Sequence, residues 1–409
     1  MTQAPGSECP FKGLSSYPIP RDPACPFEPP ATITRLRHEH PVSKVRLWDG
    51  NEVWLLTRMS DVRAMLGDDR FSSQSVHEHF PTWSAAIKAQ KTTNTSFLRK
   101  DKPEHSYERK LWQAFFAPAN IAALRPEIQG LVDHAIDQMI AAGKPVDLCR
   151  TLALAVPTGV ISKLLGIPES DMPFIQNVGT TRTGINSTPQ AVQKSLTDLH
   201  AYWMKRIQER LTNPGDDLIS KLITEEVKTG HTTAENLASM SILVLLAGFG
   251  TTADMIAMST LVLLQNPQTL AKLKADASRT PAILDEILRY TSIAQHGLAR
   301  VALEDIEIGG QLIRAGEGVV ANLASANRDE EFFSNPDRFD DERESRFHVA
   351  FGSGSHVCIG APLARAELQI VIDTLFRRLP DLRLAVPMDA VKYRLEHLFF
   401  GVDELLVEW

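Results

Sequence analysis

The residue with the clearest chemical potential is Cys358, in the segment FGSGSHVCIG from Phe351 to Gly360. The three glycines of this segment permit positive φ angles and close backbone approach, so several N–H groups could point at one atom. An amphipathic stretch with Pro362 near its first turn follows and predicts a helix over Ala361–Leu379. A cysteine before a helix N-terminus favours the thiolate, and a single thiolate without a partner cysteine suits a haem iron. A helix-capping turn around a buried cysteine would show the same spacing.

The other three cysteines, Cys9, Cys25 and Cys149, carry no comparable signal. They show no C-x-x-C spacing for zinc, and four scattered cysteines are too few to staple 409 residues through disulfides. Cys9 and Cys25 lie in the proline-rich residues 1–30, which we expect to form an extended arm on the body of the protein. This stretch lacks an apolar h-region, so we predict neither a signal peptide nor an anchor. We expect Cys149 to be structural.

A second stretch with chemical potential is AGFGTT, Ala247 to Thr252, in the middle of the long apolar segment Ser241–Leu264. The length of the segment would suit a membrane span. Asp254, two glycines and two threonines near its centre instead favour a helix buried in a large soluble core. The small, hydroxyl-bearing notch leaves backbone carbonyls free and makes room for a group beside the helix.

The composition of the chain is that of an ordinary soluble protein. Lysines and arginines number 43 against 50 aspartates and glutamates, a formal charge of −7, and 43% of residues are hydrophobic. These values exclude a disordered chain, a collagen-like repeat and a disulfide scaffold, and they give no general attraction to nucleic acid or anionic lipid. We therefore expect a soluble, cytoplasmic protein with no nucleic-acid partner and no membrane contact.

The elements that must position these residues are mainly helices. Helical periodicity predicts eight helices before the Cys358 segment: Glu104–Ala117, Ile121–Ala142, Leu152–Leu165, Gln190–Leu211, Asp216–Thr229, Thr233–Leu264, Asn266–Ala277 and Thr280–Tyr290. Strands are expected in a hairpin through Asp49-Gly50, between Ile293 and Ala321, and near the C-terminus. No linker or repeat is visible. Residues 31–409 are therefore predicted to form one large, mainly α domain with a small β-rich lobe, preceded by the arm 1–30.

The pattern F-x-x-G-x-H-x-C-x-G, which contains His356, Cys358 and Gly360, resembles the haem-binding signature of the cytochrome P-450 family. The resemblance extends over nearly the whole chain. It implies the cytochrome P-450 fold and a haem b whose iron takes the Cys358 thiolate as its axial ligand. Glu286 and Arg289 resemble the E-x-x-R motif of that family, and Arg343 resembles the third member of its Glu–Arg–Arg network beneath the haem.

Four further residues resemble the family's partners for the two haem propionates. His105 and Arg109 are spaced i, i+4 on one predicted helix face, and Arg300 and His348 occupy places where the family supplies cations. Two carboxylates need at least two charge-assisted donors, and arginine offers a planar fork for them.

The notch departs from the family pattern A-G-x-(acid)-T-(Ser/Thr). Ala247, Gly248 and Thr251 match it, but Gly250 stands where an aspartate or glutamate is usual. In typical monooxygenases this acid and the alcohol relay protons to the bound oxygen. Thr251 can still donate a hydrogen bond and hold water, and Asp254, three residues further on, either replaces the acid or caps a neighbouring group.

The fungal nitric oxide reductases of the same family also lack that acid, and Asp216–Gly230 and Ala326–Phe339 resemble their segments. Those enzymes take hydride directly from NAD(P)H through a basic patch. The corresponding span here, Ser72–Ala85, contains His77 and His79 but no lysine or arginine. A monooxygenase fed by an external redox partner is therefore the leading interpretation. A nitric oxide reductase, a non-enzymatic haem carrier or sensor, and the use of peroxide stay open as alternatives.

The resemblance also implies where the substrate lies and how electrons arrive. It places an apolar pocket for a mid-sized lipophilic substrate in Phe80–Phe97, Ile175–Asn186, the notch, Ile293–Leu298 and Leu398–Phe400. The predicted pocket residues are Phe80, Ala247, Phe249, Ala294 and Phe399, and the polar handles are His77, His79, Arg182, Gln295 and His296. No G-x-G-x-x-G follows a strand, so we expect a ferredoxin-type partner in place of a built-in flavin module. Arg109, Lys110 and Arg365 would supply its docking charge.

Overall fold

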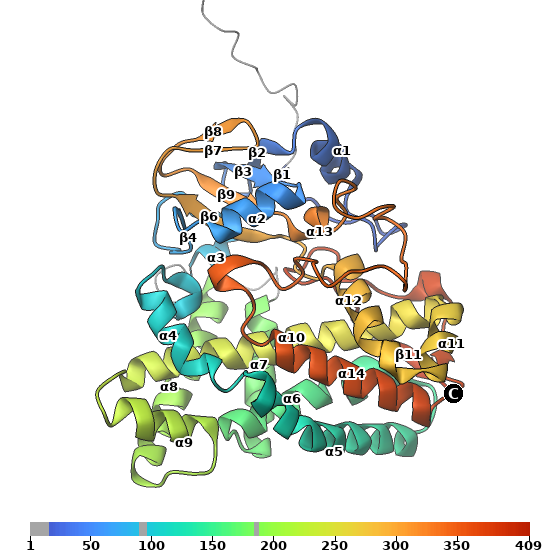
Figure 1. Cartoon of the computed structure of the whole chain (residues 1–409). Helices are drawn as coiled ribbons and strands as arrows, with labels where there is room; N and C mark the ends of the chain where they lie inside the picture. Colours follow the sequence, from blue (N-terminus) through green and yellow to red (C-terminus); the bar gives the residue numbers. More distant parts are fainter. Residues whose placement is uncertain (1–15, 90–95, 184–187) are drawn as a thin grey trace, which may run out of the picture.

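The chain folds into a β-rich lobe and a larger helical lobe, which lie one above the other in Figure 1. The computed structural model describes residues 16–89, 96–183 and 188–409, so Cys9 lies outside the described residues. This architecture confirms the predicted mainly α fold with a small β-rich lobe. The division of the chain at residue 30 stays a prediction.

The β-rich lobe is built around a six-stranded sheet. Its strands, in spatial order, are β1 (Ser16–Tyr17), β2 (Val42–Leu47), β3 (Glu52–Leu56), β9 (Gly318–Ala321), β6 (Leu298–Ala302) and β4 (Phe71–Ser72). The predicted hairpin is present: β2 and β3 pair antiparallel through a turn in which Gly50 has φ +84°. Helices α1 (Ala31–Glu39) and α2 (Met59–Gly67) pack on this lobe, and β7 (Ile306–Ile308) and β8 (Gln311–Ile313) form a separate ribbon.

The helical lobe contains the remaining helices and a small sheet. The helices are α3 (Ala85–Lys88), α4 (Glu104–Gln113), α5 (Pro118–Ala142), α6 (Ala155–Leu165), α7 (Met172–Thr183), α8 (Pro189–Thr212), α9 (Leu218–Leu222), α10 (Ala234–Gln265), α11 (Pro267–Ala275), α12 (Thr280–Thr291) and α14 (Ala361–Arg378). The short helix α13 (Leu323–Ala326) instead packs against α1 and α2 of the β-rich lobe. The sheet joins β10 (Arg383–Leu384), β11 (Leu406–Glu408) and β5 (Val146–Asp147). Two predicted helices are broken. A π-helical turn, Cys149–Ala153, precedes α6, and α9 continues as another, Ile223–Val227.

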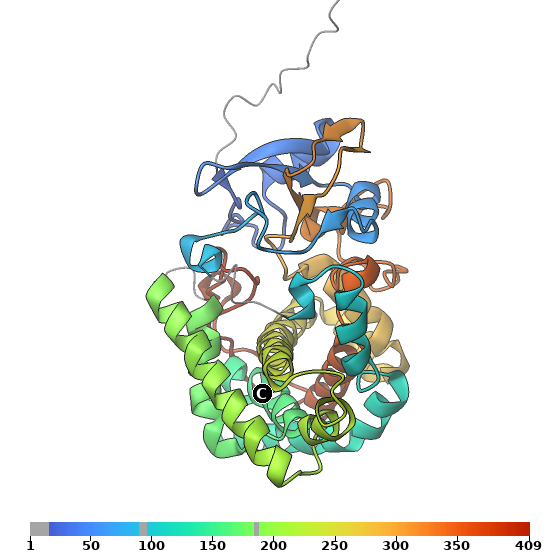
Figure 2. The ribbon, with the colours of Figure 1, turned by 90° about the vertical axis from the view of Figure 1, so that its left-hand side faces the viewer.

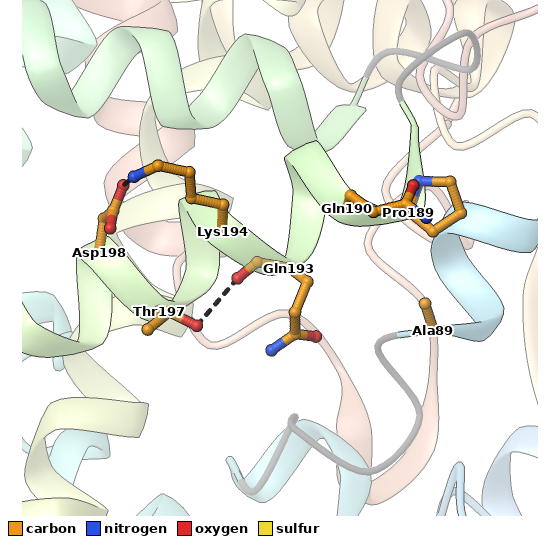
Figure 3. A pocket seen from close by; sticks show the side chains of 7 residues that line it. All are labelled: Ala89, Pro189, Gln190, Gln193, Lys194, Thr197 and Asp198. Carbon is orange, nitrogen blue, oxygen red and sulfur yellow. Dashed lines mark hydrogen bonds and ion pairs between the residues drawn. The ribbon is translucent and has the colours of Figure 1, made fainter.

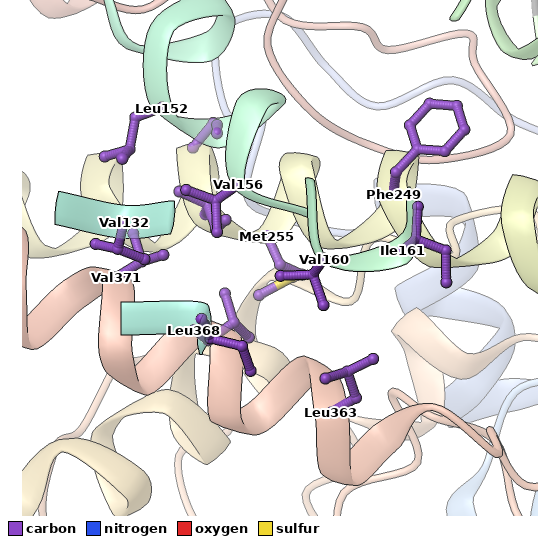
Figure 4. Packing of buried hydrophobic residues seen from close by; sticks show 14 of the residues in the cluster. Val132, Leu152, Val156, Val160, Ile161, Phe249, Met255, Leu363, Leu368 and Val371 are labelled. Atoms are coloured by element: carbon purple, nitrogen blue, oxygen red, sulfur yellow. The ribbon is translucent and has the colours of Figure 1, made fainter. Parts of the chain in front are cut away.

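Helix α10 runs through the middle of the helical lobe, as Figure 2 shows. Within the described residues it alone is long and apolar enough to cross a membrane, but 61% of its most apolar window is buried inside the protein. It packs against α6, α8 and α14. Figure 4 shows this packing, with Val160 and Ile161 of α6 and Leu368 of α14 beside α10. The prediction of a buried core helix is confirmed.

The described part of the N-terminal stretch lies on the body of the protein. Tyr17, in β1, is 2% exposed, and its hydroxyl donates to the carbonyl of His296 at 3.1 Å. Arg21 is also buried, whereas the thiol of Cys25 is free and exposed. Residues 16–30 therefore reach the loop that follows α12 and take part in the packing there.

Candidate active site

The Cys358 loop, Phe351–Gly360, is a compact turn that ends where α14 begins. The amide of Cys358 donates to the carbonyl of Phe351 at 2.9 Å, which closes the loop. The backbone amides of Gly360 and Ala361 donate to the Cys358 sulfur. Gly352 and Gly354 have φ of +76° and +72°, as the glycine pattern predicted, but Gly360 has φ −82°. The backbone conformation at position 360 is therefore one that residues other than glycine also adopt readily.

The Cys358 thiol is accessible although protein atoms surround the site. Burial by these atoms raises the pKa of the thiol. The amides of Gly360 and Ala361 and the charge of Arg109 oppose this shift without cancelling it. A coordinated metal ion deprotonates a thiol outright, so this environment suits a sulfur that is ionised only when iron is bound.

Four predicted residues form what we call the cation cluster, whose member Arg109 acts on the Cys358 thiol: His105 and Arg109 of α4, Arg300 of β6, and His356 of the Cys358 loop. The rings of His105 and His356 lie 3.9 Å apart between centroids. Burial, followed by the charge of Arg109, lowers the pKa of His105. Burial, followed by the charge of Arg300, lowers the pKa of His356 to about 2. Both imidazoles are therefore neutral at physiological pH.

The cation cluster lacks anionic partners. Among the described residues neither Arg109 nor Arg300 forms an ion pair, and only Asp101 raises the pKa of Arg300 against the effect of burial. Both ring nitrogens of His105, which is 1% exposed, have no hydrogen-bond partner. Buried polar groups are rarely left unsatisfied in this way. The cluster therefore fits a ligand with carboxylates, as haem b has, beside a thiol that can reach its iron.

Sequence reasoning did not identify the residues that support this cluster. Asp101 accepts hydrogen bonds from the Ser73 amide at 2.8 Å and the Ser73 hydroxyl at 3.1 Å, and that hydroxyl lies 3.3 Å from Nε2 of His356. The charge of Arg99 acts on His356, and its guanidinium lies 4.8 Å above the ring of Phe80. None of these residues stands in a spacing pattern that a single sequence reveals.

The structure places His348 outside the cation cluster, contrary to its predicted role. Its Nδ1 accepts a hydrogen bond from the amide of Ala350 at 3.0 Å, and its Nε2 lies 3.5 Å from Asp285 on α12. Both ring nitrogens are thus engaged within the protein, so no N–H remains for a propionate. Arg365, predicted to help dock a redox partner, pairs with the same Asp285 at 2.9 Å, which neutralises much of its charge.

Glu286, Arg289 and Arg343 meet as the resemblance implied. Glu286 is fully buried and accepts hydrogen bonds from Arg289 at 2.7 and 2.8 Å and from Arg343 at 3.2 Å. Arg289 also donates to the carbonyls of Asn327 and Pro336, both at 2.8 Å. The network therefore ties α12 to the turn-rich stretch that leads into the Cys358 loop.

The notch in α10 opens on one face of the helix. Ala247 is exposed although it lies midway along a core helix, and Thr251, one turn later, is half-buried. The Thr251 hydroxyl donates to the carbonyl of Ala247 at 2.7 Å. In the part of the chain that the structure describes, a Cβ at Gly250 would meet nothing within 4 Å beyond its own helix, whereas a Cβ at Gly248 would lie 3.0 Å from Ile161. Gly248 thus permits close helix packing, and Gly250 leaves room where the family's acid would stand.

Asp254 and Phe249 do not lie on the open face. Asp254 is 8% exposed, and its carboxylate accepts a hydrogen bond from the guanidinium of Arg394. Burial raises the pKa of Asp254 to about 6 against the opposing effect of Arg394. Phe249 is 6% exposed and belongs to the apolar core (Figure 4) because residues two apart on a helix point about 200° from one another. Its predicted place in the substrate pocket is not supported.

The other predicted pocket residues lie in two places. Ala294 and Phe399 pair through a β-bridge and are both half-buried, whereas Phe80 is buried against Ala299 and Val301. Of the proposed polar handles, His79 is exposed, and His77 contacts the hydroxyl of Ser72 at 3.2 Å. His296 is buried, which lowers its pKa to about 4. Residues 90–95, 184–187 and the side chain of Arg182 lie outside the described residues.

A surface hollow of about 560 Å³ lies between the end of α3 and the start of α8 (Figure 3). It is lined by Ala89, Pro189, Gln190, Gln193, Lys194, Thr197 and Asp198. None of these residues belongs to the Cys358 loop, the cation cluster or the notch. The hollow is therefore distinct from the chemical site.

Gly354 is expected to hold the Cys358 loop against α2. A Cβ at this position would lie 2.0 Å from the carbonyl oxygen of Leu66, and φ is +72°. Gly354→Ala should therefore destabilise the protein by about 2–3 kcal/mol and speed haem loss, measured by thermal unfolding and by transfer of haem to an acceptor protein. Gly316→Ala is the matched control because φ is +86° and nothing lies within 4 Å. Equal effects of the two substitutions would contradict the proposed contact.

Comparisons with known proteins agree with this geometry. The Cytochrome P450 family model matches residues 161–380. Cytochrome P450-SU2 of Streptomyces griseolus is 43% identical over 394 residues, 96% of this chain and 97% of that protein. Cytochrome P450 55A3 of Fusarium lichenicola is 39% identical, over 96% of this chain and 98% of its own. The structure of the mycinamicin VIII C21 methyl hydroxylase MycCI from Micromonospora griseorubida superposes with a TM-score of 0.90 at 35% identity, over 97% of this chain and 100% of that chain.

The fold and the site are those of a haem-thiolate oxidoreductase, and the chain belongs to the cytochrome P450 family. It is accordingly a monooxygenase that binds haem b, with a cysteine thiolate as the axial ligand of the iron. It takes a small-molecule substrate and electrons from an external redox partner.

Proposed function

We propose that this monooxygenase inserts one oxygen atom of O2 into a mid-sized lipophilic compound in the cytoplasm, with electrons from a ferredoxin-type protein. The observation that carries the proposal is the combination of an accessible Cys358 thiol, held by two backbone amides, with the guanidinium groups of Arg109 and Arg300, which form no ion pair with any described residue. Haem b bound there through a thiolate supplies the activation and transfer of oxygen. The substrate class rests on the apolar pocket that the family resemblance predicts and on the relative MycCI, whose structure was solved with mycinamicin VIII bound.

The residues of this chain have separate roles in the proposed reaction. Cys358 holds the iron, and Arg109, Arg300 and the neutral His105 hold the haem carboxylates. Thr251 keeps its hydroxyl at the open face of α10, where it can exchange its bond to Ala247 for a bond to water. Two electrons and two protons are consumed for each oxygen atom inserted. The delivery of protons past Thr251 therefore governs what share of the consumed electrons and O2 yields product.

Labelling with ¹⁸O₂ tests the reaction type. The holoenzyme, supplied with a ferredoxin and its reductase and with mycinamicin VIII as the first probe of a lipophilic panel, is expected to place one labelled atom in the product. A product without the label would contradict monooxygenation. A reduced, carbon-monoxide-bound spectrum without the red-shifted Soret band of thiolate ligation would contradict the role of Cys358.

Gly250→Glu is expected to raise the share of consumed O2 that appears in product by several-fold, up to roughly tenfold, because the added acid restores proton delivery beside Thr251. The space for it exists, since among the described residues no atom beyond the helix backbone and the adjoining residues lies within 4 Å of a Cβ at this position. The share is measured from product and released hydrogen peroxide. Gly250→Gln is the control of equal size without an ionisable group, and an equal gain in both variants would refute the relay argument.

Asp254→Asn completes this comparison. Because Asp254 is paired with Arg394, we expect its replacement to leave the share of product in the Gly250→Glu protein unchanged. If Asp254→Asn alone lowers the share of consumed O2 that appears in product as much as Gly250→Glu raises it, then Asp254 already serves as the acid.

The second candidate function, nitric oxide reduction with NAD(P)H, is favoured by the missing acid at Gly250. A stopped-flow mixture of the holoenzyme, nitric oxide and NAD(P)H without protein partners separates the two functions. Rapid oxidation of NAD(P)H would support the second candidate and overturn the first.

A further inference from the structure

A hairpin from Tyr393 to Val402 carries Phe399, one of the predicted pocket residues. Tyr393 and Val402 are bridged at its base, and the amide of Arg394 donates to the carbonyl of Gly401 at 2.8 Å. On one edge the amide of Phe400 donates to the carbonyl of Ile293 at 2.8 Å. The half-buried side chain of Phe399 lies at this edge, among the predicted pocket residues.

The side-chain amide of Gln295 fixes the backbone of this hairpin. Its Nε2 donates to the carbonyls of Arg394 at 3.4 Å and Leu395 at 3.2 Å, and also to that of His397. Its Oε1 accepts a hydrogen bond from Nε of Arg21 at 3.2 Å. Carbonyls only accept and a guanidinium only donates, so Arg21 and the hairpin together allow one orientation of the Gln295 amide.

Arg21 comes from the N-terminal stretch and is 4% exposed. It donates to the carbonyls of Thr291 at 3.0 Å and Pro26 at 3.2 Å, and its guanidinium lies 4.2 Å above the ring of Phe400. Within the described residues it has no carboxylate partner. Burial lowers its pKa to about 9, which still leaves it charged near neutral pH. A buried cation satisfied by oxygens of three segments holds those segments in one arrangement.

The opposite side of the hairpin is anchored to α10. Arg394 donates to Asp254, which lies one turn beyond Gly250. A Cβ at Gly401 would lie 2.9 Å from the carboxylate of Asp254 and 2.5 Å from the guanidinium of Arg394. The absence of a side chain at Gly401 therefore leaves the room that this ion pair occupies. The hairpin is therefore held between the core helix on one side and the N-terminal stretch on the other.

We propose that Arg21, acting through Gln295, is a positioning residue that sets the placement of the 393–402 hairpin and thereby the width of the substrate pocket. This inference rests on the proposed function in one respect, the location of the pocket beside Phe399. The N-terminal stretch then determines which substrates fit, although it touches no reacting atom.

The test uses two haem ligands of different size on the holoenzyme. Imidazole needs little room beside the iron, whereas 4-phenylimidazole also needs the pocket. Arg21→Met and Gln295→Leu are each expected to change the Kd of 4-phenylimidazole, read from the spectral shift, by about five- to tenfold, and that of imidazole by less than about twofold. The double variant should change it no further because the two residues act in series. Arg46→Met, an exposed arginine on β2, is the control and should change neither Kd.

Gln295→Glu isolates the contact that matters. A glutamate keeps the acceptor for Arg21 but loses the donors to the hairpin, so it is expected to behave like Gln295→Leu. The proposal is overturned if Gln295→Glu binds both ligands like the natural protein, or if the variants change both ligands by the same factor. The reduced, carbon-monoxide-bound spectrum of each variant reports whether the Cys358 thiolate binds the iron, independently of where the hairpin lies. Loss of the thiolate band in the natural protein would therefore refute the proposed function and leave the size comparison readable.

Discussion

Cys358→Ser is expected to abolish the red-shifted Soret band of the reduced, carbon-monoxide-bound protein and to lower product formation by at least about 10³-fold, equivalent to roughly 4 kcal/mol of barrier. The loop would keep its shape because the amide of residue 358 still donates to the carbonyl of Phe351 and because serine differs by one atom. The loss would therefore come from the ligand itself. A hydroxyl ionises far less readily than a thiol and pushes less electron density onto iron.

Cys149→Ser is the matched control for that experiment. Cys149 is half-buried in the π-helical turn before α6, and burial strongly raises the pKa of its thiol, so it is expected to be inert. Its replacement should leave the spectrum and the product yield unchanged. If the thiolate band survives in Cys358→Ser or disappears in Cys149→Ser, the assignment of Cys358 as the iron ligand is wrong.

Glu286→Gln is expected to destabilise the folded protein by about 3–5 kcal/mol and to yield little haem-loaded material. Glu286 and Arg289 are both fully buried, and the substitution leaves the guanidinium groups of Arg289 and Arg343 without their counter-charge. Arg289 would then be a buried cation without a counter-charge, stabilised by the hydrogen bonds that it donates to carbonyls of the stretch before the Cys358 loop. Urea unfolding and the ratio of Soret to protein absorbance measure the two effects.

Glu342→Gln separates burial from charge. Glu342 also pairs with two cations, Lys272 and Arg279, but its side chain is 61% exposed. Exposed ion pairs contribute little to stability, so this variant should unfold near the natural midpoint. Equal losses of unfolding free energy in Glu286→Gln and Glu342→Gln would show that burial does not strengthen the contribution of the Glu286 network to stability.

The sequence was sufficient for those parts of the site that local pattern controls. The periodicity of α10 and α14 predicted helices that begin and end within one residue of the observed ones. The i, i+4 spacing of His105 and Arg109 placed both on the face of α4 that joins the cation cluster. Helix geometry also excludes Phe249 from the face of Ala247, so that error could have been avoided.

The sequence was insufficient wherever a partner comes from a distant segment. His348 turned to Asp285, and Asp254 turned to Arg394, 140 residues away. The contact of Arg21 with Gln295 spans 274 residues. Such pairings depend on how helices and loops pack, and no periodicity in the chain encodes them. For the same reason the expectation of a proline-rich arm lying on the body of the protein did not include the buried contacts of Arg21.

The cation cluster has a consequence for the life of the polypeptide in the cell. Helix α4 and strand β6 bring Arg109 and Arg300 to the same two imidazoles, His105 and His356, and only the charge of Asp101 acts against burial on Arg300, so the excess positive charge is expected to oppose closure of the two lobes while the polypeptide carries no haem. The haem carboxylates reverse the sign of that contribution, so haem binding and lobe closure form one linked equilibrium. We therefore expect the polypeptide to be more prone to unfolding and degradation in a haem-starved cell than in a haem-replete one.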